Sequence, residues 1–241
     1  MTQAFMNWSG GKDSAFCLHQ ILQSNEYQVS SLLTSVNAVY DRVSMHGVRR
    51  SLLEAQSLSL GIPVRTIELP EQPEMNEYEE EMMNRINELK NSGCTHAIFG
   101  DIFLEDLRRY REEKLGKAGI QCLFPLWRKD TAGLVKEFIA LGFKAIIVCI
   151  NEQFLSRDFC GRIIDEDFLP DLPESVDPCG ENGEFHSFVF DGPLFHQPVS
   201  FRKGNIVYKK YTAPQNTGNT IHSATDPDQY GFYFCDLLPA S

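Results

Sequence analysis

The first 150 residues alternate short β-branched or apolar segments with longer amphipathic ones. This alternation is typical of parallel strands joined by crossover helices. The expected strands are 4–8, 29–35, 63–67, 96–99, 121–124 and 144–150. The expected helices are 14–23, 48–60, 77–92, 104–118 and 131–141. The pattern therefore predicts an α/β fold with a doubly wound, mostly parallel, Rossmann-like sheet, whose ligands bind beyond the carboxyl ends of the strands.

The pattern changes after about Asn151. Three prolines at 170, 173 and 178 interrupt any long helix. Strand-like runs follow at 184–190, 199–202 and 206–211, and turn sequences at 191–193 and 203–205 separate them. Residues 214–229 are polar and predict a linker or mobile loop, and the aromatic run 230–234 predicts a terminal strand. We therefore expect a first domain over residues 1–150 and a smaller α+β domain over 151–241.

A glycine-containing motif separates the first expected strand from the first expected helix. It consists of Ser9, Gly10, Gly11, Lys12, Asp13 and Ser14. Adjacent glycines let the backbone turn sharply and approach an anion, and the helix that follows contributes unsatisfied N–H groups and the positive end of its dipole. With a lysine and two hydroxyls, the segment predicts a phosphate cradle. The alternative is an ordinary Ser-Gly turn capped by Asp13 or Ser14.

A second motif, Cys179 to Ser187, carries two carboxylates three residues apart in a turn framed by Gly180 and Gly183. Such a loop can present Glu181 and Glu184 to a ligand amine, a metal or a proton in transit. The alternative is a tight turn with solvated acids that leads into a strand.

Three further sites carry candidate residues. Gly100 and Asp101 end an expected strand, and Arg109 and Arg111 on the next helix could hold a carboxylate or phosphate through forked hydrogen bonds. The alternative for that helix is an exposed face of ion pairs. His46 follows the second strand, where it could contact phosphate, carry a proton or have no role. Trp127 could line a pocket or pack in the core.

The Ser9–Ser14 motif resembles the SGGxDS loop of the PP-loop, or N-type, ATP pyrophosphatases. Together with the acidic loop it resembles the diphthine-ammonia ligase family, whose second signature reads approximately GEGGEYET. The chain matches that signature at Gly180, Glu181, Gly183 and Glu184 and departs from it at three positions. Those departures are Asn182, His186 and Ser187.

The resemblance implies the chemistry as well as the fold. It implies ATP cleaved between the α and β phosphates, with Mg²⁺, so that a substrate carboxylate is adenylated and then attacked by ammonia. In that family the substrate is diphthine, a modified histidine on elongation factor 2, and the product is diphthamide. It implies an ATP-binding domain over 1–150 and a substrate domain over 151–241. The implied catalytic residues are Lys12, Asp101, Glu181 and Glu184.

The resemblance also implies binding residues. The ATP site would comprise the Ser9–Ser14 loop with His46 and Gly100. The substrate site would comprise Arg109, Gly180 and Gly183. The resemblance does not identify the acceptor carboxylate, the source of ammonia or the metal ligands. It also leaves open which of the two glutamates is catalytic and whether the protein forms a homodimer.

Composition limits the other function classes. The chain carries 22 Lys and Arg against 33 Asp and Glu, a net charge of −11, which argues against generic binding to nucleic acid or anionic membranes. The seven cysteines form no Cys-x-x-Cys pair, which is typical of reduced thiols in a cytosolic protein. With no apolar run of membrane-spanning length and no signal-peptide pattern, we expect a cytoplasmic protein.

Two other functions stay open beside the ligase. One is a PP-loop enzyme that modifies tRNA or transfers sulfur, which would depend on a cysteine such as Cys179. The other is a non-catalytic sensor that binds a nucleotide.

Overall fold

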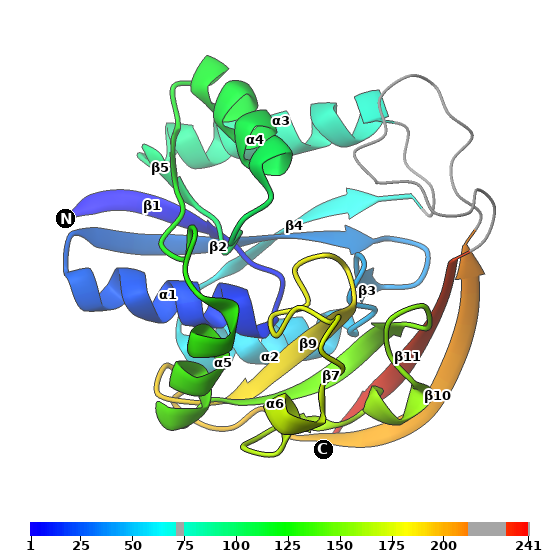
Figure 1. Cartoon of the computed structure of the whole chain (residues 1–241). Coiled ribbons are helices and arrows are strands. Elements are labelled where there is room, and N and C mark those ends of the chain that lie inside the picture. Colours follow the sequence, from blue (N-terminus) through cyan, green and yellow to red (C-terminus); the bar gives the residue numbers. More distant parts are fainter. Residues whose placement is uncertain (71–74, 212–229, 241) are drawn as a thin grey trace.

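The computed structural model describes residues 1–70, 75–211 and 230–240. Two sheets form the molecule (Figure 1). The strands of the first are β1 (Thr2–Asn7), β2 (Tyr27–Asn37), β3 (Arg42–Val43), β4 (Val64–Leu69), β5 (His96–Ile98) and β6 (Gln121–Leu123). Its helices are α1 (Lys12–Ser24), α2 (Arg50–Leu60), α3 (Met75–Asn91), α4 (Glu105–Lys117) and α5 (Thr131–Ala140). Each expected strand and helix of residues 1–141 is therefore present.

The order of the parallel strands confirms the doubly wound sheet. Across the sheet they run β4, β2, β1, β5 and β6, every neighbouring pair is parallel, and the short β3 adds an antiparallel pair to β2. The chain winds outward from β1 through β2 to β4 and then returns to place β5 on the other side of β1. The carboxyl ends of β1 and β5 therefore flank the point where ligands of such sheets bind.

Apolar side chains of the strands point alternately to two faces. Phe5 of β1 joins a core with Ile86 and Leu89 of α3 and Leu115 of α4. Ala4 and Met6 join the other core, which includes α1, α2, α5 and the second sheet. Figure 1 shows this layering: α3 and α4 cover one face of the first sheet, while α1 and α2 lie between the two sheets.

The second sheet is antiparallel. It contains β7 (Lys144–Asn151), β8 (Ile163–Ile164), β9 (Phe185–Asp191), β10 (Phe201–Tyr211) and β11 (Tyr230–Pro239). The short helices η1 (Arg157–Phe159) and α6 (Phe168–Asp171) lie between β7 and β9 in the chain. The terminal strand predicted at 230–234 is confirmed as part of β11, and the loop predicted at 214–229 lies outside the described residues.

Two expectations about this sheet were wrong. We expected strand 144–150 in the parallel sheet, but β7 pairs with β8, β9 and β11 in the second one. Seven of its eight residues are buried, so its apolar run does not reveal which sheet it joins. The turn expected at 203–205 is a register shift inside one strand, because β10 pairs with β11 on both sides of it.

No helix in the described parts of the chain is long and apolar enough to cross a bilayer.

Candidate functional site

The glycine loop follows the carboxyl end of β1 and leads into α1, as the motif predicts. Gly10 has a φ of +79°, and a Cβ built there would lie 2.8 Å from Oε1 of Gln56. A Cβ on Gly11 would lie 3.0 Å from Cε1 of His46 and 3.1 Å from the Ser187 carbonyl oxygen. Both positions therefore require glycine, because the loop passes tightly between α2, His46 and β9.

The start of α1 leaves backbone donors for an anion. Gly11 is the N-cap residue and provides no side-chain cap, so the alternative of a turn capped by Asp13 or Ser14 does not describe this helix. The Lys12 N–H donates to Oγ of Ser187 (3.1 Å), whereas no described residue accepts from the N–H of Asp13 or Ser14. Unsatisfied N–H groups at a helix N-terminus fit a phosphate group.

The two serines of the motif support the loop. Oγ of Ser9 accepts from the Gly11 N–H (3.2 Å) and lies 3.1 Å from Oγ of Ser14. Oγ of Ser14 donates to the Gly11 carbonyl oxygen (2.9 Å). These bonds hold the loop in its curved form without using the N–H groups of the first helical turn.

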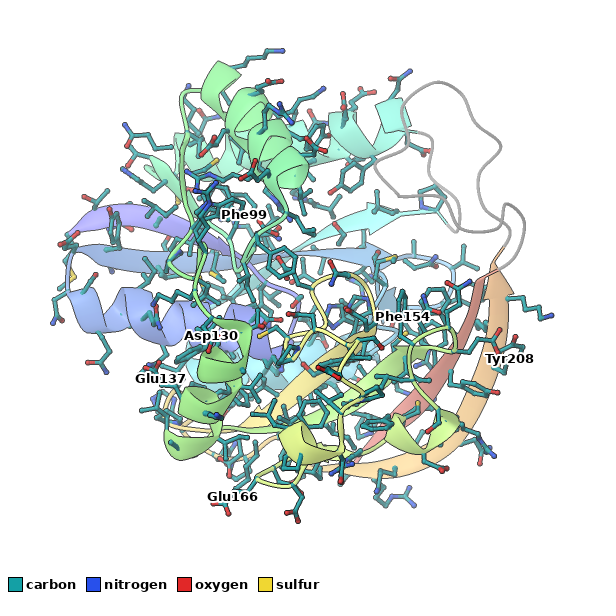
Figure 2. The ribbon with its side chains drawn as sticks, in the orientation of Figure 1. Phe99, Asp130, Glu137, Phe154, Glu166 and Tyr208 are labelled. Atoms are coloured by element: carbon teal, nitrogen blue, oxygen red, sulfur yellow. The ribbon has the colours of Figure 1, made fainter. Side chains whose placement is uncertain are left out.

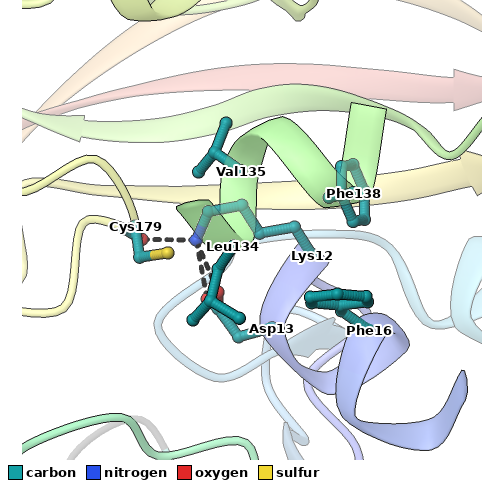
Figure 3. Close-up of a pocket in the computed structure, with 7 residues that line it drawn as sticks. All are labelled: Lys12, Asp13, Phe16, Leu134, Val135, Phe138 and Cys179. Atoms are coloured by element: carbon teal, nitrogen blue, oxygen red, sulfur yellow. Dashed lines mark hydrogen bonds and ion pairs between the residues drawn. The ribbon is translucent and has the colours of Figure 1, made fainter. Parts of the chain in front are cut away.

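The side chain of Lys12 is buried and points toward the acidic loop rather than toward the glycine loop. Its Nζ lies 2.7 and 2.8 Å from the carboxylate oxygens of Asp13 and donates to the carbonyl oxygen of Cys179, in the acidic loop (Figure 3). Burial alone would lower the pKa of Lys12, but the Asp13 carboxylate raises it above its ordinary value. Lys12 is therefore charged, and it joins the glycine loop to the acidic loop.

The two glutamates of the acidic loop have different surroundings. Glu184 is 1% exposed, and its carboxylate accepts from the N–H groups of Asp177 (3.0 Å) and Asn182 (2.9 Å) and from Nδ2 of Asn182 (3.1 Å). It therefore braces its own loop. Glu181 is partly exposed, and its Oε1 accepts from the Ile102 N–H (2.7 Å), beyond the end of β5. Gly180 and Gly183 frame this turn and contribute no side chain.

Glu181 has the electrostatics of a group that exchanges protons near neutral pH. Burial, together with the charges of Asp13 and Asp101, raises its pKa to about 7, against the opposing effect of the Ile102 N–H and Lys12. A pKa near 7 suits a general acid or base. The structure thus brings Asp13, which follows β1, and Asp101, which follows β5, close to Glu181 of the acidic loop.

Gly100 and Asp101 lie beside the start of α1. A Cβ on Gly100 would lie 3.1 Å from the backbone carbonyl of Asp13 and 3.2 Å from the Ser14 N. Asp101 pairs with Arg111 of α4, whose Nη2 donates to Oδ1 (3.1 Å). Burial raises the pKa of Asp101, although Arg111 opposes the shift.

Arg109 does not join this cluster. Its side chain is 66% exposed and pairs with Asp106 one turn back on α4. It lines a surface hollow of about 320 Å³ together with Glu105, Arg108, Glu112, Trp127 and Arg128. The guanidinium of Arg108 stacks on Trp127, 4.6 Å from the ring centre. The ion-pair alternative therefore describes this face of α4, and Arg111 is the arginine that reaches the strand ends.

His46 reaches the glycine loop from beyond β2. Its Nδ1 lies 3.1 Å from the Ser187 carbonyl oxygen, so Nδ1 carries the hydrogen, and its ring stacks on His186 at 4.5 Å between centroids. Burial lowers the pKa of His46 to about 4 and holds that of His186 well below its usual range. Both rings are therefore neutral at neutral pH.

Three residues at the site were not predicted from the sequence. Ser187 accepts from the first helical turn of α1, Asp177 accepts from the N–H groups of Cys179 and Glu181, and Gln56 donates to Gly10 and Val189. Only Ser187 offered a signal, because it is the last residue of the acidic motif. The contacts of Asp177 and Gln56 arise from tertiary packing.

A metal site is less clearly defined than the phosphate-binding loop. The described residues contain no group of three or more His, Cys, Asp or Glu arranged around one point. Mg²⁺ usually takes one or two carboxylates together with substrate phosphates and waters, so Asp13 and Asp101 fit its donor set. Bound there, the ion would neutralise charge on the phosphates.

Comparison with known proteins gives two family matches. Residues 1–121 match the family described as "Diphthamide synthase N-terminal domain" and residues 130–214 match "Diphthamide synthase C-terminal domain". The second match begins before β7, in agreement with the place of that strand in the second sheet.

Curated relatives agree with the family matches. A protein of Mus musculus named diphthine–ammonia ligase is 30% identical over 215 residues, which cover 79% of each chain. Proteins of the same name from Danio rerio and Homo sapiens are 28% and 26% identical. These alignments cover 79% and 83% of this chain and 83% and 82% of the relatives.

Proposed function

The chain belongs to the diphthamide synthase family, and from that premise we propose that it is an ATP-dependent ligase that adenylates a carboxylate and transfers ammonia to it. By their name, the relatives act on diphthine and ammonia. Diphthine is therefore the first acceptor to test for this chain.

The observation that carries the proposal is the direct joining of two loops. Lys12 of the glycine loop bonds to the Cys179 carbonyl, and the Lys12 N–H bonds to Ser187, so that the acidic loop meets the N-terminus of α1. A phosphate-binding segment and a titratable carboxylate then face one reaction centre. This arrangement suits a reaction that first forms an acyl phosphate bond and then moves a proton from nitrogen.

In the first step, a carboxylate oxygen of the acceptor attacks the α phosphorus of ATP. A new oxygen–phosphorus bond forms, the bond to the β phosphate breaks, and pyrophosphate leaves with the electron pair. The N–H groups of Asp13 and Ser14 are placed to stabilise charge that develops on phosphate oxygens. Adenylation replaces oxide, a very poor leaving group, with AMP.

In the second step, the nitrogen of ammonia attacks the acyl carbon, and AMP leaves. The nitrogen must lose a proton as the amide forms. Glu181 supplies the acceptor for that proton, since its pKa of about 7 lets it be ionised at neutral pH and still bind a proton well. Glu184 holds the loop that carries it.

The proposal is tested by incubation of the protein with ATP, Mg²⁺, ammonium and elongation factor 2 that bears diphthine. We expect AMP and pyrophosphate in equal amounts, and an amide on the acceptor. Production of ADP and orthophosphate, or of AMP without an acceptor, would contradict it. Substitution of a host extract for the factor would find a different acceptor carboxylate.

A further inference from the structure

The ion pair between Asp101 and Arg111 is poorly aligned for two groups that are mostly buried. Nε of Arg111 lies 2.9 Å from Oδ2 of Asp101, but the angle is unsuitable and neither atom has a hydrogen-bond partner among the described residues. The side chain of Arg111 is 20% exposed and that of Asp101 is 12% exposed. Buried polar atoms are rarely left without a partner, so this pair retains hydrogen-bonding capacity that a ligand could use.

The position of Arg111 places that capacity beside the carboxyl end of β5, where Asp101 lies. Its guanidinium stacks on Phe99, 4.3 Å from the ring centre, just after β5. Figure 2 shows Phe99 in the interior of the molecule, between the first sheet and α4. A planar ring under the guanidinium fixes its plane while its edge stays available for forked hydrogen bonds.

The charges around the centre need a cation of this kind. Glu181 accepts from the N–H of Ile102, the neighbour of Asp101, and Gly100 lies against the backbone of Asp13, so these two loop contacts bring three acidic residues to one centre. A metal ion on Asp13 and Asp101 would offset part of this negative charge, and an anionic ligand is still favoured by a positive side chain beside it. Lys12 is 3% exposed and already holds Asp13 and the Cys179 carbonyl, so it is committed elsewhere.

We infer that Arg111 is a ligand-binding residue of this site, and that its guanidinium turns from Asp101 to hold an oxyanion, either a phosphate of ATP or the carboxylate of the acceptor. The carboxylate assignment rests on the proposed function, whereas the phosphate assignment requires only that ATP binds. Arginine suits both because its donor fork matches the paired oxygens of either group.

The test compares Arg111→Ala and Arg111→Lys with Arg109→Ala, a matched control two residues away on α4 whose exposed side chain lies outside the cluster. Thermal unfolding reports whether each variant folds. One arm measures the Kd of MgATP by calorimetry, and the other measures the KM of the acceptor in AMP release at saturating ATP. If Arg111→Ala does not fold, Arg111→Lys alone decides the outcome, because it keeps the charge and removes the fork.

We expect at least an approximately tenfold increase in one of the two constants for Arg111→Ala, a smaller increase for Arg111→Lys, and a change under about twofold for Arg109→Ala. An increased Kd of MgATP indicates that Arg111 binds a phosphate of ATP. An increased KM of the acceptor with an unchanged Kd indicates that Arg111 binds the acceptor carboxylate. Folded Arg111 variants with both constants within about twofold of wild type overturn the inference. If the wild-type protein binds MgATP but releases no AMP, the proposed function is refuted. In that case the inference about Arg111 depends on the Kd of MgATP alone, and an unchanged Kd in the Arg111 variants overturns it.

Discussion

The ammonium group of Lys12 donates a hydrogen bond to the backbone carbonyl oxygen of Cys179, which lies 167 residues further along the chain. That contact ties the first loop of the parallel sheet to the acidic loop before β9. Around it lie Phe16, Leu134, Val135 and Phe138, with a cavity of only about 10 Å³, too little space for more than one water molecule (Figure 3). The role of Lys12 therefore includes holding the two halves of the site together.

Lys12→Ala should lower both turnover and stability. It leaves the Cys179 carbonyl and the Asp13 carboxylate without their donor, which costs about 1–3 kcal/mol for the buried carbonyl. Thermal unfolding and AMP release measure the two effects. Lys12→Met is the comparison, because it keeps most of the side-chain volume and removes the charge together with the hydrogen-bond donors. Normal turnover in both variants would refute the assignment of the glycine loop.

Glu181 should control the pH dependence of activity. Since its pKa is raised to about 7, kcat should rise with pH through about 7 as the carboxylate ionises. Glu181→Gln should lower kcat by about 100-fold and abolish that limb of the profile. Glu184→Gln is the comparison, and we expect it to reduce stability more than to move the profile. An unchanged pH profile in Glu181→Gln would show that another group titrates.

The same carboxyl should affect stability in a defined direction. In the unfolded chain Glu181 ionises near its usual pKa of about 4.5, but in the folded protein it ionises near 7, so the folded state binds more protons between these values. The free energy of unfolding should therefore fall by about 1–3 kcal/mol as the pH rises from about 4.5 through about 7, and level off from this source once the pH is well above 7. Glu181→Gln should lack this slope. Urea unfolding over that pH range measures it, and an identical slope in the variant would contradict the raised pKa.

Cys179→Ala should retain activity. Burial raises the pKa of the Cys179 thiol well above its usual range, and its Sγ donates to the Thr131 carbonyl at 3.5 Å, so it is neither ionised nor accessible as a sulfur nucleophile. The backbone carbonyl that Lys12 uses is unaffected by the substitution. AMP release in the presence of acceptor and ammonium measures the result. Loss of activity with unchanged thermal stability would favour the sulfur-transfer function.

Gly100→Ala should weaken ATP binding. The added Cβ would meet the backbone of Asp13 and Ser14, which cannot yield without displacement of the N-terminus of α1. Gly116→Ala, inside α4 with no atom of the described residues within 4 Å of its added Cβ, is the matched control and should stabilise the protein by about 0.5–1 kcal/mol. Calorimetric titration with MgATP and thermal unfolding test both. Wild-type affinity in Gly100→Ala would contradict the close approach.

The sequence predicted the parallel sheet well because its strands and helices have distinct hydrophobic periods and a glycine follows the end of four of its helices, α2 to α5. It did not predict the partners of β7, because a strand buried on both faces carries no period that distinguishes one sheet from another. The run 203–205 was misassigned for a different reason, because its turn-like composition gave no sign that β11 would pair with β10 on both sides of it.

The sequence located the two motifs of the candidate site, but it did not predict which residue within each motif has which role. Glu181 and Glu184 have the same side chain three residues apart, and only packing determines that one braces its loop while the other reaches Ile102. Arg109 and Arg111 differ in the same way, since two positions along an α-helix correspond to about 200° of rotation, and packing determines that Arg109 lies in solvent and Arg111 on Phe99.

The most direct test of the account follows the fate of ATP labelled in its γ phosphate, with diphthine-bearing elongation factor 2 and isotopically labelled ammonium. We expect the γ label to leave as pyrophosphate, AMP to form in proportion to the acceptor, and the labelled nitrogen to appear as an amide on the acceptor. Release of the γ label as orthophosphate, or AMP formation that is independent of any acceptor carboxylate, would contradict it.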